Sequence, residues 1–133
     1  MADLHAAEHE SGRLSVEEAL SPDTRPWGNY VVLGEPDHDP IAAVKILTVE
    51  PGGMLSLQTH RLRRERWVPI STGLGAIIGD QEYPLLLGHT YEIDIGVPHR
   101  LFDLEGSGGS VVETMYGTYD EADIIRLSDR YDR

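Results

Sequence analysis

The sequence predicts an all-β protein, built as a sandwich or barrel of mainly antiparallel strands. From Trp27 onward, short β-rich runs are cut by Gly, Pro and Asp at the spacing typical of such folds. No helix of the length that a crossover between parallel strands requires lies between these runs. The 133 residues, 40% of them hydrophobic, suffice for one domain with a packed core.

The chain divides into a polar start and a globular body. Residues 1–24 are polar and acidic, and we expect a tail or a packing arm there. Within it, Ser15 and Glu18 fit a capping box, which is typical of the start of a short helix. The domain is expected over residues 25–133.

The body contains nine runs with the composition of strands, separated by turn signals. The turn signals include PGG at 51–53, Gly-Asp at 79–80 and GSGGS at 106–110. The expected strands cover residues 30–33, 41–49, 54–60, 66–71, 74–78, 83–87, 90–95, 99–104 and 110–116.

The last expected element is a short terminal helix over residues 120–130. Ile124, Ile125 and Leu127 would form its apolar side. Asp120 or Glu121 would favour its start through the helix dipole. We expect this helix to dock on the barrel.

Composition excludes several classes of site and partner. Cysteine is absent, so disulfides and cysteine-bound metals are excluded. The net charge of −12 repels nucleic acid and anionic membrane surfaces, so neither is an expected partner. No run approaches the length of a membrane span, and we expect a soluble cytoplasmic protein.

The few basic residues are unevenly placed, since several of the ten Arg gather between positions 61 and 66. Arg binds phosphate or carboxylate through two parallel hydrogen bonds, so this cluster can serve a small anion. A solvated loop is the alternative.

Polar residues in and after the third expected strand have the types and spacing of a metal site. Ser56, Gln58 and His60 alternate along the strand and therefore face one side. On an isolated sheet this row could equally face solvent. Glu65 follows five residues after His60, and His99 lies after the turn at 96–98. Two imidazole nitrogens and two oxygens suit zinc, manganese, iron, cobalt or nickel.

These residues lie in strings that resemble a known family. QTHRLRRERW at 58–67 and GVPHR at 96–100 resemble the two metal-binding motifs of a cupin β-barrel, or jelly roll. The flanking strings match, in order, the cupin domain of type II mannose-6-phosphate isomerases. That domain also forms the C-terminal part of bifunctional mannose-1-phosphate guanylyltransferase/isomerase enzymes. The flanking strings are RPWGNY at 25–30, VK at 44–45, PGGMLSLQTH at 51–60, GTYDEADIIR at 117–126 and DRYDR at 129–133.

The resemblance implies a metal-dependent aldose–ketose isomerase of a hexose phosphate, with mannose 6-phosphate and fructose 6-phosphate as the pair. It implies a divalent metal, zinc first, on Gln58, His60, Glu65 and His99, and a sugar pocket that Ser56 lines. Cupins often pair their barrels, so it also implies a homodimer. It does not imply nucleotidyl transfer, because no Gly-rich nucleotide loop lies near the start of the chain.

Three further residues receive roles. Isomerisation removes a proton beside a carbonyl, which requires a base, and Glu113 in an apolar strand is the first candidate, before a hydroxide on the metal. Arg126 and Arg63 are candidates for the phosphate. Glu113 could instead bind Arg126 or a histidine, and Arg126 could pair with a helix neighbour. Trp27 and Trp67 fit the core better than a sugar-stacking role.

The match departs from the family at the pocket. Arg61, Leu62 and Arg66 stand where histidines are usual, and Pro69, which suggests a bulge or an edge, replaces a β-branched residue. Two other functions therefore remain: a non-catalytic cupin that binds a sugar or small anion, and another cupin enzyme such as an epimerase or an iron oxygenase.

Overall fold

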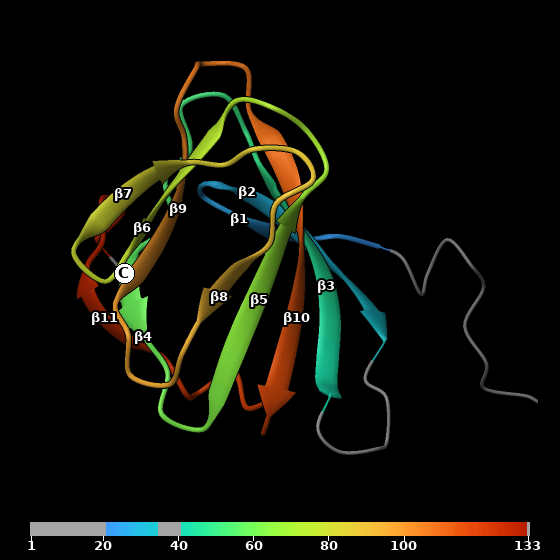
Figure 1. The fold of residues 1–133 in the computed structure, drawn as a ribbon, viewed down its shortest axis with the longest axis vertical. Helices are drawn as coiled ribbons and strands as arrows, with labels where there is room; N and C mark the ends of the chain where they lie inside the picture. Colours follow the sequence, from blue (N-terminus) through green and yellow to red (C-terminus); the bar gives the residue numbers. More distant parts are fainter. Residues whose placement is uncertain (1–20, 35–40, 133) are drawn as a thin grey trace, which may run out of the picture.

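The computed structural model describes residues 21–34 and 41–132, which form eleven β-strands and no helix (Figure 1). The strands are β1 (Asp23–Arg25), β2 (Gly28–Gly34), β3 (Ile41–Val49), β4 (Leu57–Thr59), β5 (Arg63–Pro69), β6 (Leu74–Ile78), β7 (Gln81–Pro84), β8 (Tyr91–Ile93), β9 (His99–Asp103), β10 (Gly109–Gly117) and β11 (Ile125–Ser128). The helix predicted at Ser15 lies outside the described residues. Within that described part, no helix could span a membrane.

Two antiparallel sheets face each other across the interior (Figure 1). One has the strand order β1-β2-β3-β10-β5-β8, and the other has the order β11-β4-β9-β6-β7. Strands distant in the sequence become neighbours, because β10 lies between β3 and β5, and β9 lies between β4 and β6. The predicted all-β, antiparallel architecture is confirmed.

Alternation along the long strands decides which side chains enter the interior. On β3 and β5 every second residue is buried, as a strand with one covered face requires. The buried positions of β5 are Arg63, Glu65, Trp67 and Pro69. The interior is therefore polar where β5 begins and apolar where it ends, where Trp67 packs with Leu101 and Val111 in the core.

The predicted helix at 120–130 is wrong, because this segment forms a turn followed by β11. Asp120 accepts hydrogen bonds from the turn itself, through its carbonyl from Asp123 N and through its carboxylate from Ala122 N. Short acidic side chains that bind nearby backbone compete with helix formation. Beyond the turn, β11 gains backbone partners from β4, which a helix would forgo.

The Arg-rich segment is part of a strand rather than a loop, since β5 begins at Arg63, three residues before the predicted start. Arg64 and Arg66 point outward and pair with Glu92 at 3.4 and 2.6 Å. Only Arg63 of these three enters the interior. Pro69 ends β5 beyond the stretch that pairs with β8, so its missing N–H costs no bond to that strand.

Candidate metal centre

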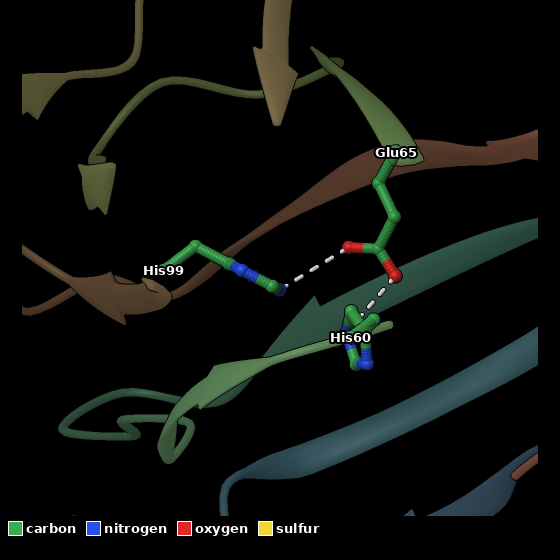
Figure 2. A group of neighbouring side chains, drawn as sticks. All are labelled: His60, Glu65 and His99. Atoms are coloured by element: carbon green, nitrogen blue, oxygen red, sulfur yellow. Dashed lines mark ion pairs between the residues drawn. The ribbon is translucent and has the colours of Figure 1, made fainter. Parts of the chain in front are cut away.

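Three side chains from different segments meet where the interior is polar. His60 follows β4, Glu65 lies on β5 and His99 begins β9. Figure 2 shows the Glu65 carboxylate between the two rings: His60 Nε2 lies 3.3 Å from Oε2, and His99 Nε2 lies 3.4 Å from Oε1. One ligand atom from each residue lies within 4.8 Å of the others, which is close enough for one cation to bind all three.

Hydrogen bonds on the far side of each ring orient the histidines. His60 Nδ1 lies 2.6 Å from the carbonyl oxygen of Asp123, and His99 Nδ1 lies 2.9 Å from that of Val97. A carbonyl only accepts, so each Nδ1 carries the hydrogen, and a ring that is neutral directs an Nε2 lone pair at Glu65. Two lone pairs aimed at a carboxylate require a proton or a cation between them.

The pKa shifts indicate where charge lies among these three side chains. Burial lowers the pKa of His60, with the Arg63 charge acting in the same direction, so this ring stays neutral. Burial also disfavours charge on His99, but the adjacent Glu65 outweighs it and raises the pKa of that ring. Burial likewise opposes ionisation of Glu65, yet the His99, His60 and Arg63 neighbours hold its pKa well below the usual range. Glu65 therefore stays an anion that holds positive charge beside it.

The residues present fit a divalent metal. Glu65 is 1% exposed, and no N–H of the described residues reaches its Oε1 unless the His99 ring is protonated, so a cation bound to that oxygen would take the place of this proton. Gln58 stands opposite His99 in the β4–β9 register and lines the same cavity. Its amide nitrogen donates to the Ser56 carbonyl at 3.4 Å, which leaves the amide oxygen as the atom that can bind a cation. Two nitrogens and two oxygens suit a borderline metal.

Arg63, a candidate for the phosphate, lies within this centre. Its Nε donates to Glu65 Oε2 at 2.9 Å, and its Nη2 lies 3.3 Å from His60 Nε2. The side chain is buried, and Nη1 reaches the Asp120 carbonyl at 3.4 Å. The guanidinium thus neutralises Glu65 from one side, while the unpartnered Oε1 faces His99.

Behind the centre, three register neighbours form one row across the six-stranded sheet: Lys45 on β3, Glu113 on β10 and Trp67 on β5. Trp67 Nε1 donates to Glu113 Oε2 at 2.9 Å, so Trp67 packs in the core and also hydrogen-bonds a carboxyl group that lines the cavity. Burial, with the Glu65 charge in second place, raises the pKa of Glu113 to about 8. Glu113 is therefore a carboxyl group able to hold or accept a proton near neutral pH.

Lys45 is a cavity residue to which we assign no role from the sequence alone. It is buried at 6% exposure, and its Nζ lies 4.2 Å from the Tyr30 ring centre and 4.5 Å from that of Tyr119. The sequence does contain a signal: Lys45 is the single lysine, and it occupies a core-facing position between Ala43 and Leu47 on a nine-residue strand.

The remaining predicted site residues line the same cavity. Ser56 is fully buried and its Oγ has no hydrogen-bond partner. Arg126 lies on β11 opposite Gln58, at an exposed position on the rim. The cavity has a volume of about 140 Å³ and opens to solvent.

The charge of the cavity differs from that of the whole chain. Its described lining includes four Lys or Arg side chains and three acidic side chains: Arg25, Lys45, Arg63 and Arg126 against Glu65, Glu113 and Glu121. In the whole sequence, 23 acids stand against 11 bases. The cavity therefore favours an anionic ligand before any metal charge is added.

Comparisons with known proteins find relatives of this sequence. The mannose-6-phosphate isomerase C-terminal family matches residues 15–129. The xanthan biosynthesis protein XanB of Xanthomonas campestris pv. campestris (strain B100) is 36% identical over 110 residues, and the alginate biosynthesis protein AlgA of Pseudomonas aeruginosa is also 36% identical over 110 residues. A mannose-1-phosphate guanylyltransferase of Escherichia coli (strain K12) is 34% identical over 111 residues. Each alignment covers 82% of this chain but only 22–23% of the relative.

Solved structures share the fold at low sequence identity. The capsular polysaccharide assembling protein CapF of Staphylococcus aureus superposes with a TM-score of 0.69 at 15% identity, over 80% of this chain and 32% of that one. A variant of Streptomyces PAC13 with uridine superposes with a TM-score of 0.70 at 14% identity, over 90% and 93%. The cupin barrel predicted from the sequence is confirmed. By sequence, the chain belongs to the mannose-6-phosphate isomerase C-terminal family.

Proposed function

We propose that this chain is a metal-dependent aldose–ketose isomerase that interconverts mannose 6-phosphate and fructose 6-phosphate, with zinc as the ion. The observation that carries the proposal is the convergence of His60 Nε2, His99 Nε2 and the buried Glu65 carboxylate within 4.8 Å of one another. These side chains open onto a cavity with a surplus of basic side chains. Family membership and the sugar-phosphate names of several relatives support the substrate class.

The ion would be held by Gln58, His60, Glu65 and His99, and when bound it would polarise the substrate carbonyl and the adjacent hydroxyl. The proton on the carbon beside the carbonyl would pass to Glu113, whose raised pKa suits a group that both accepts and returns it. Ser56 Oγ, unpartnered and buried, would bind a sugar hydroxyl. Arg126 on the rim would meet the phosphate, while Arg63 keeps Glu65 in place.

A binding function without turnover has one observation in its favour. The Arg63 guanidinium lies within 3.3 Å of both His60 Nε2 and Glu65 Oε2, so the chain itself supplies a cation beside these atoms. With Arg63 in the place of a metal ion, the cavity could bind an anionic sugar without a metal. Bound metal with no turnover of any hexose phosphate would favour this alternative.

Elemental analysis followed by a coupled assay with mannose 6-phosphate tests the proposal. We expect about one equivalent of divalent metal in the wild type. His60→Ala and His99→Ala should each lower metal content severalfold or more, because each removes a nitrogen ligand and exposes the others to water. Full metal occupancy in both variants would overturn the assignment of the centre.

Arg126→Ala serves as the matched control in the same cavity. Its side chain lies on β11 at an exposed position, so metal content should stay at the wild-type value. Its KM for mannose 6-phosphate should rise about tenfold or more, since a charge-assisted contact to phosphate is lost. An unchanged KM would remove Arg126 from the phosphate site.

A further inference from the structure

The segment that follows β10 runs beside the segment that carries His60. We call residues 118–128 the strap. β11, at its end, pairs with β4, placing Ile125 opposite Thr59 and Arg126 opposite Gln58. At its beginning, Thr118 N donates to the Leu62 carbonyl at 3.0 Å. The strap therefore hydrogen-bonds the chain both before His60, at β4, and after it, at Leu62.

The strap also supplies part of the cavity lining, since Tyr119, Glu121, Ile124 and Arg126 all line it. Most of the strap is nevertheless exposed, and Asp123 is its one buried residue, at 9% exposure. Few buried contacts therefore hold the strap, and Asp123 is the principal one.

Asp123 binds three consecutive residues at the metal centre. Its carbonyl oxygen accepts from His60 Nδ1 at 2.6 Å. Its carboxylate accepts from the backbone N–H groups of Arg61 at 2.9 Å and Leu62 at 2.8 Å, with a separate oxygen for each. The carbonyl sets the orientation of the His60 ring, and the carboxylate fixes both that carbonyl and the turn after His60.

This double contact requires a carboxylate. Two backbone donors bind two acceptor oxygens, whereas an Asn side chain offers one oxygen and an NH₂ group that cannot accept. Hydrogen bonds to an ionised carboxylate are stronger than those to neutral groups. An Asp→Asn change therefore loosens the turn while leaving the size of the side chain unchanged.

We propose that Asp123 is a positioning residue for His60, and that through it metal binding at the centre orders the strap. The inference rests on the metal centre of the proposed function, but not on the identity of the sugar or on turnover. Coupling of this kind is reciprocal: a strap that orients His60 for the metal must itself be stabilised when the metal binds.

The first test measures zinc affinity of the full chain by competition with a chromophoric chelator. Asp123→Asn should bind zinc 10–100-fold more weakly than the wild type, the usual effect of losing a group that orients a metal ligand. Asp120→Asn is the matched control, because its carboxylate caps the strap turn at Ala122. It should stay within about twofold of the wild type, because Asn keeps an oxygen that can accept the single Ala122 N–H and the centre loses no contact. Equal affinity of Asp123→Asn and the wild type would overturn the inference.

Cobalt substitution separates positioning from general support of the fold. At saturating Co²⁺, the visible absorption of Asp123→Asn should differ in position or intensity from the wild type, because the His60 ring is reoriented. Asp120→Asn should retain the wild-type spectrum. Weaker binding with an unchanged spectrum would give Asp123 a purely structural role and overturn the positioning role.

A measurement on the wild type alone keeps the inference testable if Asp123→Asn does not fold. Amide hydrogen exchange of Arg61, Leu62 and the strap should slow at least tenfold at saturating zinc, while exchange in the turn at Asp80 stays unchanged. No slowing in the strap would overturn the coupling while leaving the metal centre intact. Absence of zinc binding by the wild type would instead overturn the metal centre and, with it, this inference.

Discussion

At the scale of the residue, the centre depends on two buried oxygens that the described residues leave poorly satisfied. Ser56 Oγ has no hydrogen-bond partner, and Glu65 Oε1 has only the His99 ring, at 3.4 Å. Unsatisfied buried groups are costly, so their presence at one cavity indicates that a ligand completes them. The two oxygens suit different ligands: the carboxylate oxygen suits a cation, and the hydroxyl suits a sugar.

Glu113→Gln in metal-free protein tests the buried carboxyl group at this scale. The folded state holds the Glu113 proton up to a pKa of about 8, against an ordinary value of 4.5. Between these values the folded protein binds the proton and the unfolded chain does not, so stability falls as pH rises, by up to about 1.4 kcal/mol per pH unit. Gln cannot titrate, so the stability of the variant relative to wild type should increase across this window.

Urea unfolding in EDTA at several pH values between 4.5 and 8 measures this difference. The exposed Glu82→Gln variant is the control, and its difference from the wild type should stay constant. A Glu113→Gln difference that is equally constant would contradict the buried, protonated state.

At the scale of the element, the sequence predicts strands well and their partners poorly. Alternation identifies β3 and β10 nearly to their ends, since one face of each is covered. The apolar run of β6 is identified by its composition and its flanking glycines. Apolar periodicity alone did not distinguish a helix from β11, because the outcome depends on backbone partners in β4. Asp123 is hidden for the same reason: its donors lie 61 and 62 residues away. The motif residues were predictable because strand spacing and family resemblance mark them without knowledge of the pairing.

Asp103 joins two loops at the end of β9, and Asp103→Asn tests that junction. Its carboxylate accepts backbone N–H groups from Gly52 at 2.7 Å, Gly106 at 3.0 Å and Gly108 at 3.1 Å. Asn keeps one acceptor oxygen, so the variant should lose about 1 kcal/mol of stability at pH 7, discounted for partial exposure.

The pH dependence of this difference has a defined sign. The hydrogen bond from Gly52, with those from the other loop amides, holds the pKa of Asp103 below its ordinary value of 3.8. The stabilisation is therefore present above pH 3.8 and is lost as pH falls through the lower, folded-state value. Urea unfolding from pH 7 downward should show the wild type and Asp103→Asn converging in acid, whereas exposed Asp80→Asn should match the wild type throughout. A gap that persists in acid would argue for a packing effect instead.

At the scale of the whole molecule, charge and fold act together on the centre. The net charge of −12 attracts cations over the surface, while the cavity concentrates basic side chains around one buried carboxylate. The two sheets supply complementary parts: β5 contributes Glu65, while β4 and β9 contribute the segments with Gln58 and His99. The centre exists only when both sheets are assembled, so metal binding and folding of the barrel must be thermodynamically linked.

Zinc should therefore stabilise the entire barrel against unfolding. An ion that binds only the folded state adds about 2.7 kcal/mol at a free concentration one hundred times its Kd. For a domain of this size, that corresponds to a rise in Tm of several degrees, which EDTA should reverse. Magnesium at the same concentration should have little effect, because it prefers oxygen ligands and water over imidazole. His60→Ala and His99→Ala should lose the zinc response, and a response retained in both would mean that zinc acts elsewhere on this acidic protein.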